Sequence, residues 1–253
     1  MLQPKTQGSE LIDRLNDLIR RDERSDFVLK QVSRDADRLK KIDAATSYLL
    51  LGMVACLERN ITATREFHEK ALKLRDDFVT NSNYATSLFR IGAIIEAISY
   101  RERAVKLEPG NLTVLEKLID NAIAACRFRY AQQLIDKWKS MSPNKKNNNE
   151  KMVNDYVSVM NESKVSDEEA ESFLKLASNH MLTSRAFLSF AKPGCELDVL
   201  EEDSARWIGY CFNVDKGVDD VVEMNCGFAD LVAANVDPKI LKSIVVRYSA
   251  TQD

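Results

Sequence analysis

The chain has 253 residues, of which 45% are hydrophobic and 30% are charged, and its net charge at neutral pH is −3. This length can bury the core of one large domain or of two modest ones, and the apolar content excludes a disordered chain. Only 8 glycines and 5 prolines are present, which is too few for the many chain reversals of an all-β sandwich. Composition therefore predicts a helix-rich protein and leaves its function open.

The sequence predicts neither a membrane protein nor a secreted one. The densest apolar run, 48–57, covers ten residues, whereas a membrane-spanning helix needs about 20. The first ten residues lack the basic region and the apolar stretch of a signal peptide. The five cysteines are odd in number, widely spaced and never arranged as CxxC, which is typical of reduced thiols. We therefore expect a cytoplasmic protein with no membrane partner.

The small net charge is the sum of two unequal parts. Residues 165–253 hold 8 basic and 16 acidic side chains, a balance of −8. The first 164 residues hold 28 basic and 23 acidic side chains, a balance of +5. Such a difference between two parts of a chain indicates two units with different surfaces.

Residues 1–43 are predicted to form a helical cap at the N-terminal end. Leucine and isoleucine residues between positions 11 and 19 recur at three- and four-residue spacing, which is typical of an amphipathic helix. A polar break follows, and Ser25 can cap a second helix that carries Phe27 and Val32.

Residues 44–144 contain three segments that fall into register with one another. Ala71 and Ala104 are 33 residues apart, and Pro109 and Pro143 are 34 apart. A repeat of this period, with small residues where two helices touch and proline after the second helix, resembles the tetratricopeptide repeat (TPR) family.

The resemblance implies TPR-like helical hairpins stacked in a right-handed superhelical array, so the fold class expected is mainly α. Small residues let two helices approach closely, and proline ends a helix. The positions that match the family are Tyr48, Leu51 and Gly52 in the first helix, Gly92 at a turn, Ala71, Ala97, Ala104 and Ala131 at small sites, and Pro109 and Pro143 at repeat ends. Thr64, Asp76 and Trp138 depart from the family pattern. The alternative is an irregular helical bundle.

The resemblance also implies a partner-binding groove on the concave face, lined by the first helix of each hairpin. Chaperone-docking members hold a carboxylate with Lys and Asn in the first repeat, where this chain has Leu49 and Met53. We therefore expect a peptide with an apolar anchor rather than a chaperone tail. The alternative is that neighbouring elements cover residues 49–57. The groove residues carried over are Leu49, Met53, Asn83, Thr86, Phe89, Arg90, Lys117 and Asp120.

After the repeats, residues 145–164 are predicted to form a linker and a capping helix. The remainder, 165–253, is predicted to be a small acidic α+β domain, for which we recognise no family. It opens with the capping-box pattern Ser166 to Glu169. Runs rich in β-branched and aromatic residues predict a hairpin near 196–214, and a helix and a last strand follow.

Five acidic residues near the predicted hairpin form the one candidate for a cation site, because hard cations take oxygen ligands. Solvated turns are the favoured interpretation, and docking of a basic protein surface is a third. These residues are Glu196, Asp198, Glu201, Glu202 and Asp203, and Asp215, Asp219 and Asp220 belong to the same candidate cluster. The two histidines have no ligand partner at helical spacing, and no phosphate-binding, zinc or nucleophile motif is present. We therefore predict no catalytic residues, no metal and no cofactor.

Nucleic acid is not the partner expected, because acidic residues alternate with the basic ones over 20–41. The sequence as a whole predicts a non-enzymatic adaptor that binds a peptide or protein partner through the groove. The alternative is an inhibitor or immunity-type protein that binds a basic partner through its acidic C-terminal domain. The oligomeric state is left open.

Overall fold

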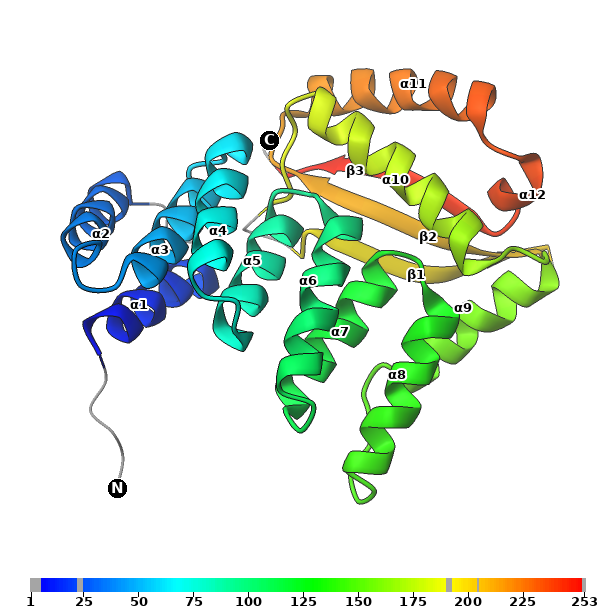
Figure 1. Cartoon of the computed structure of the whole chain (residues 1–253). Helices are drawn as coiled ribbons and strands as arrows, with labels where there is room; N and C mark the ends of the chain where they lie inside the picture. Colours follow the sequence, from blue (N-terminus) through cyan, green and yellow to red (C-terminus); the bar gives the residue numbers. More distant parts are fainter. Residues whose placement is uncertain (1–5, 22–24, 190–192, 204, 252–253) are drawn as a thin grey trace.

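The computed structural model describes residues 6–21, 25–189, 193–203 and 205–251. It confirms a mainly helical chain with a small three-stranded sheet near the C-terminal end. The helices from α3 (Ala44–Leu57) to α8 (Phe128–Met141) stand side by side, and α10 (Asp167–Thr183) and α11 (Val218–Asn235) lie on the same side of the sheet (Figure 1). In the described part of the chain, no helix combines the length and the apolar character that crossing a bilayer requires.

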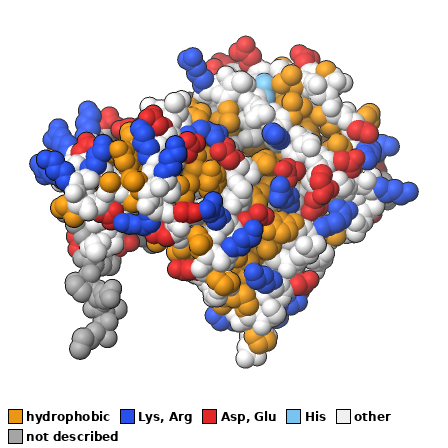
Figure 2. Space-filling model, in the orientation of Figure 1, with side chains coloured by type: hydrophobic (Ala, Val, Ile, Leu, Met, Phe, Trp, Pro, Cys, Tyr) orange, Lys and Arg blue, Asp and Glu red, His pale blue; other side chains and the backbone are white. Residues whose placement is uncertain are grey.

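The N-terminal helices α1 (Gln7–Arg21) and α2 (Asp26–Leu39) pack against α3 (Ala44–Leu57). Ser25 caps the start of α2 as predicted, because its hydroxyl accepts a hydrogen bond from the Val28 amide at 3.4 Å. Basic and acidic side chains lie close together over these first helices, at the left of Figure 2.

Six helices follow the pattern of three hairpins, with connections at 58–60, 91–93 and 125–127. Alanine allows the close helix contacts, because Ala71 and Ala104 are completely buried. The bounds are α3 (Ala44–Leu57), α4 (Ile61–Leu74), α5 (Phe78–Arg90), α6 (Ile94–Leu107), α7 (Leu112–Ala124) and α8 (Phe128–Met141).

The three hairpin turns share one backbone conformation. The middle residue of each turn is left-handed: φ is 60° at Arg59, 87° at Gly92 and 57° at Cys126. In each turn the amide of the next residue donates to a carbonyl of the preceding helix at 2.9 Å. This is the hydrogen bond that closes a helix whose chain leaves through a left-handed residue. The spacing of these residues, 33 and then 34, follows from their numbers and equals that of the sequence repeat.

The C-terminal part contains the predicted hairpin, helix and strand. Strands β1 and β2 are antiparallel, and β3 pairs parallel to β2 after a helical crossover, giving the order β1-β2-β3. The capping box is confirmed, because Ser166 and Glu169 exchange hydrogen bonds at the start of α10. The bounds are α9 (Glu150–Glu162), α10 (Asp167–Thr183), β1 (Cys195–Glu202), β2 (Ala205–Val214), α11 (Val218–Asn235), α12 (Pro238–Leu241) and β3 (Ile244–Ala250).

One hydrophobic core runs from the second hairpin to the last strand, including Ile94 on α6 and Tyr248 on β3. Residues 165–253 therefore pack on the helical hairpins through this shared core. The Tyr210 hydroxyl, for example, donates to the carbonyl of Ala124 at 2.8 Å.

The C-terminal part also contacts the turns of the first two hairpins. Arg59 forms an ion pair with Asp215, and its guanidinium lies 5.4 Å from the centre of the Phe187 ring. At the second turn, the Ser178 hydroxyl on α10 donates to the carbonyl of Gly92. A Cβ at Gly92 would lie 2.2 Å from the Met181 methyl, so α10 approaches this turn as closely as glycine permits.

Candidate binding groove

A groove of about 1160 Å³ lies between α5, α7 and the segment that leads into β1. Six of the predicted groove residues line it together: Asn83, Thr86, Phe89, Arg90, Lys117 and Asp120. They come from two helices, because α5 carries the first four and α7 carries the last two. Leu188 and Pro193, from the C-terminal part, also line it.

Leu49 and Met53 lie elsewhere, with exposed fractions of 2% and 4%. Both belong to the hydrophobic cluster that α1 and α2 form over α3, together with Leu15 and Val32. The physical reason is that α3 is apolar around almost its whole circumference, and such a helix must be covered on all sides. The groove therefore lacks the apolar residues of the first hairpin that were predicted to line it, and the N-terminal helices cover them, as the alternative interpretation of residues 49–57 proposed.

Arg101 on α6 lines the groove and was missed by the sequence analysis. Its side chain is buried, with 3% of the residue exposed. The guanidinium donates to the Ser82 hydroxyl at 2.7 Å, the Thr86 hydroxyl at 2.8 Å and the Asn121 side-chain oxygen at 3.2 Å. The sequence did hold an indication of its role. Arg101 lies on the apolar stripe of α6, between Ala97 and Ala104, and a charged residue is unexpected at such a position.

Burial shapes the charges of the groove. It lowers the pKa of Arg101 to about 10, against the opposing attraction of Asp120, so the guanidinium stays charged at pH 7. Partial burial, and then Arg101, lower the pKa of Lys117. Partial burial raises the pKa of Asp120, although Asn149 donates to its carboxylate at 2.9 Å. Among the described residues that line the groove, Arg101 and Lys117 face this one carboxylate, so they give this part of the groove a net positive charge.

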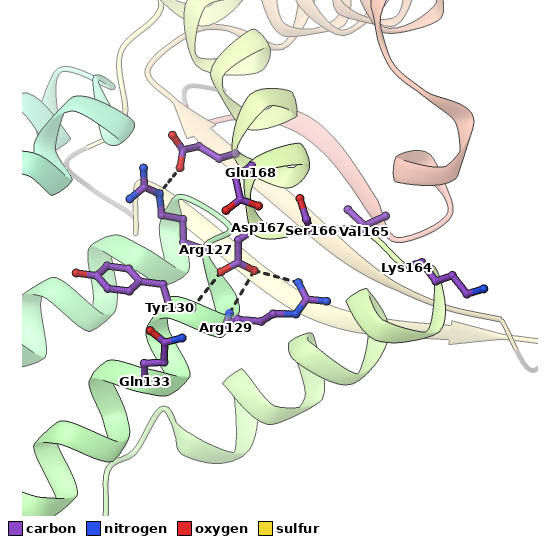
Figure 3. Close-up of a pocket in the computed structure, with 10 residues that line it drawn as sticks. Arg127, Arg129, Tyr130, Gln133, Lys164, Val165, Ser166, Asp167 and Glu168 are labelled. Carbon is purple, nitrogen blue, oxygen red and sulfur yellow. Dashed lines mark hydrogen bonds and ion pairs between the residues drawn. The ribbon is translucent and has the colours of Figure 1, made fainter.

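A second cavity of about 670 Å³ lies where α10 begins beside the start of α8. Figure 3 shows that Asp167 points from α10 toward the first turn of α8. Its carboxylate accepts hydrogen bonds from the amides of Arg129 at 3.3 Å and Tyr130 at 3.0 Å, and from the Arg129 guanidinium at 3.2 Å. Arg127 is paired with Glu171. These charged side chains are paired with one another, and the pairs hold α10 against the start of α8. We therefore interpret this cavity as part of a structural contact between the two helices.

The acidic cluster predicted from the sequence does not converge on one point. Glu196 and Asp198 are exposed along β1, and their carboxylates accept hydrogen bonds from the Asn213 side chain and the Val199 amide. The others, Glu201, Glu202 and Asp203, are also exposed, at and beyond the end of that strand. Over the residues that the structure describes, no three His, Cys, Asp or Glu side chains are placed to hold a metal ion.

Comparison of the chain with protein-family models, with curated proteins and with solved structures found no match. The resemblance to TPR proteins therefore stays a prediction from the residues.

Proposed function

We propose that this protein is a non-enzymatic adaptor that captures a peptide segment of a partner in the groove between α5 and α7. The observation that carries the proposal is the buried guanidinium of Arg101. It donates hydrogen bonds to three neutral side-chain oxygens, and the nearby Asp120 carboxylate makes no hydrogen bond with it, so this buried positive charge would attract a further anionic group strongly.

The ligand that fits is an extended or helical peptide with an acidic side chain beside an apolar one. The acidic group would approach Arg101 and Lys117, and the apolar group would contact Phe89 and Leu188, which line the same groove. Arginine forms paired hydrogen bonds with carboxylates, which gives such a site directional selectivity. This ligand keeps the apolar anchor expected from the sequence and adds an acidic group, and its anchor would contact Phe89 because Leu49 and Met53 are covered.

We infer further that α3 to α8 are TPR-like repeats in a right-handed superhelical array. The support is the shared turn conformation, the recurrence of 33 and 34 residues, and the buried alanines at the helix contacts. We place the protein in the cytoplasm because all five cysteines are free thiols, as a reducing compartment keeps them.

The test compares the full chain with a Lys117→Glu variant on an array of synthetic peptides, followed by fluorescence anisotropy on the best binder. We expect the array to favour acidic peptides, and the variant to bind at least about tenfold more weakly, which corresponds to about 1.4 kcal/mol. Lys137→Glu is the matched control, because Lys137 is exposed on α8 and does not line the groove. A preference for basic peptides, or equal binding by Lys117→Glu and the unmodified chain, would refute the proposal.

A further inference from the structure

The strand register sorts the side chains of the sheet into two faces. Residues paired across β1 and β2, such as Leu197 with Tyr210, point to the same side, as do Tyr210 and Val246 across β2 and β3. This inner face belongs to the main hydrophobic core. The opposite, outer face is defined by Glu196, Asp198, Leu200, Glu202, Ala205, Trp207, Gly209, Cys211, Asn213, Val245, Arg247 and Ser249.

The helices that cover the sheet leave most of the outer face exposed, although Cys211 and Asn213 on the central strand are buried. Leu200 is 43% exposed and Val245 is 46% exposed, at opposite edges of the sheet. Trp207 is half-buried and is paired directly with Leu200 across the strands. A Cβ at Gly209 would lie 2.8 Å from a Leu200 methyl, so Leu200 lies across the central strand. A sheet face turned to water usually carries polar residues, whereas the centre of this one is aromatic and aliphatic.

The charges of the outer face are unequal. Glu196, Asp198 and Glu202 form an exposed acidic row on β1, and Arg247 is the basic residue of the face. Two copies packed face to face would bring six carboxylates together with two guanidinium groups, which is unfavourable. An apolar centre with an acidic rim instead complements a surface that has a hydrophobic centre and a basic rim.

We propose that the outer face of the sheet is a second docking surface, which binds a folded partner through a patch of apolar residues surrounded by lysine and arginine. This interaction goes beyond peptide capture in the groove and uses different residues. Trp207 and Leu200 supply the apolar contact, since aromatic side chains often dominate the binding energy at such centres. The acidic row of β1 speeds association and selects partners of positive charge.

The test places the photoreactive residue p-benzoylphenylalanine at Leu200 in the full chain, inside the cells that naturally produce it. We expect one dominant cross-linked protein, with the adduct on a segment rich in Lys and Arg. The yield in the cells should fall about fivefold or more when Asp198→Lys and Glu202→Lys are combined, and in a lysate of the same cells it should fall similarly when salt rises from about 0.05 to about 0.5 M. The same photoreactive residue at Lys137, on the exposed side of α8, should not form this adduct.

Three outcomes would overturn the proposal: an adduct to a second copy of the chain, an adduct to a neutral or acidic surface, or no adduct beyond that seen at Lys137. Thermal melts of the charge-reversed variant check that it folds. Lys117→Glu separates the two proposals, because it should weaken peptide binding in the groove and leave the cross-link at Leu200 unchanged.

Discussion

His68 makes the stability of this protein depend on pH. It is completely buried between the first two hairpins, with its Nε2 2.9 Å from the Ser87 hydroxyl and its ring stacked on Tyr84 at 4.8 Å. Gly52 lies against the ring so closely that a Cβ there would be 2.6 Å from it. Burial without a neighbouring charge lowers the pKa of His68 from 6.5 to about 3. The folded protein therefore keeps this imidazole neutral.

The sign of the effect follows from proton binding. Below pH 6.5 the unfolded chain binds a proton at His68, whereas the folded protein does not until about pH 3. Acidification therefore favours the unfolded state, and the stability present above pH 6.5 is lost progressively on the way down. At 1.36 kcal/mol for each pKa unit, the loss from this residue at pH 5 is about 2 kcal/mol.

The assay is urea unfolding of the full chain and of a His68→Gln variant, each at pH 7.5 and pH 5. Glutamine can still reach the Ser87 hydroxyl but does not titrate. The free energy of unfolding should fall by about 2 kcal/mol more in the unmodified chain than in the variant. His180, whose pKa burial also lowers, is present in both proteins, so its contribution cancels. Equal losses in the two proteins would show that His68 is protonated in the fold and would refute the reasoning.

Two further predictions concern the contacts between the hairpins and the C-terminal part. Gly92→Ala should destabilise the protein by about 1–3 kcal/mol in thermal melts, because φ is 87° and the Met181 methyl occupies the space of a Cβ. Gly110→Ala, with nothing within 4 Å of the added methyl, should change stability by less than about 0.5 kcal/mol, and equal effects would contradict the steric argument. Asp167→Ala should cost about 1–2 kcal/mol because it removes the acceptor for two amides at the start of α8. Lys175→Ala, at an exposed position on α10, is its control in the same melts.

The sequence was informative where a residue type is needed at a fixed place. The sequence predicted the close helix contacts from alanine and the start of α10 from Ser166 and Glu169. Both predictions depend on interactions between neighbouring residues or neighbouring helices, which a sequence pattern can reveal. The turns at Arg59 and Cys126 were not predictable in this way. Both residues adopt a left-handed conformation that glycine adopts at lower cost, and only the shared hydrogen bonds reveal the common form.

The groove was predicted in part for the same reason. Lys117 and Asn83 follow from the groove positions that the resemblance to TPR proteins implies, and both line the groove. The covering of Leu49 depends on how α1 and α2 pack, which the sequence indicates only through the apolar circumference of α3. Arg101 comes from the second helix of its hairpin, and the carried-over groove positions did not include that helix. The packing of 165–253 on the hairpin turns involves long-range contacts for which the sequence offered no pattern.

The contacts of the C-terminal part with Arg59, Gly92 and Ala124 change how the stack of hairpins can move. In an ordinary repeat array each repeat contacts only its neighbours. Such an array can therefore bend or extend along its length, and its end repeats can unfold one at a time. In this protein the C-terminal part contacts three successive hairpins at or beside their turns. Bending would have to break an ion pair, a buried hydrogen bond and a packed core together. These contacts should hold the groove on α5 and α7 at one width, so a peptide bound as proposed would meet a preformed cleft.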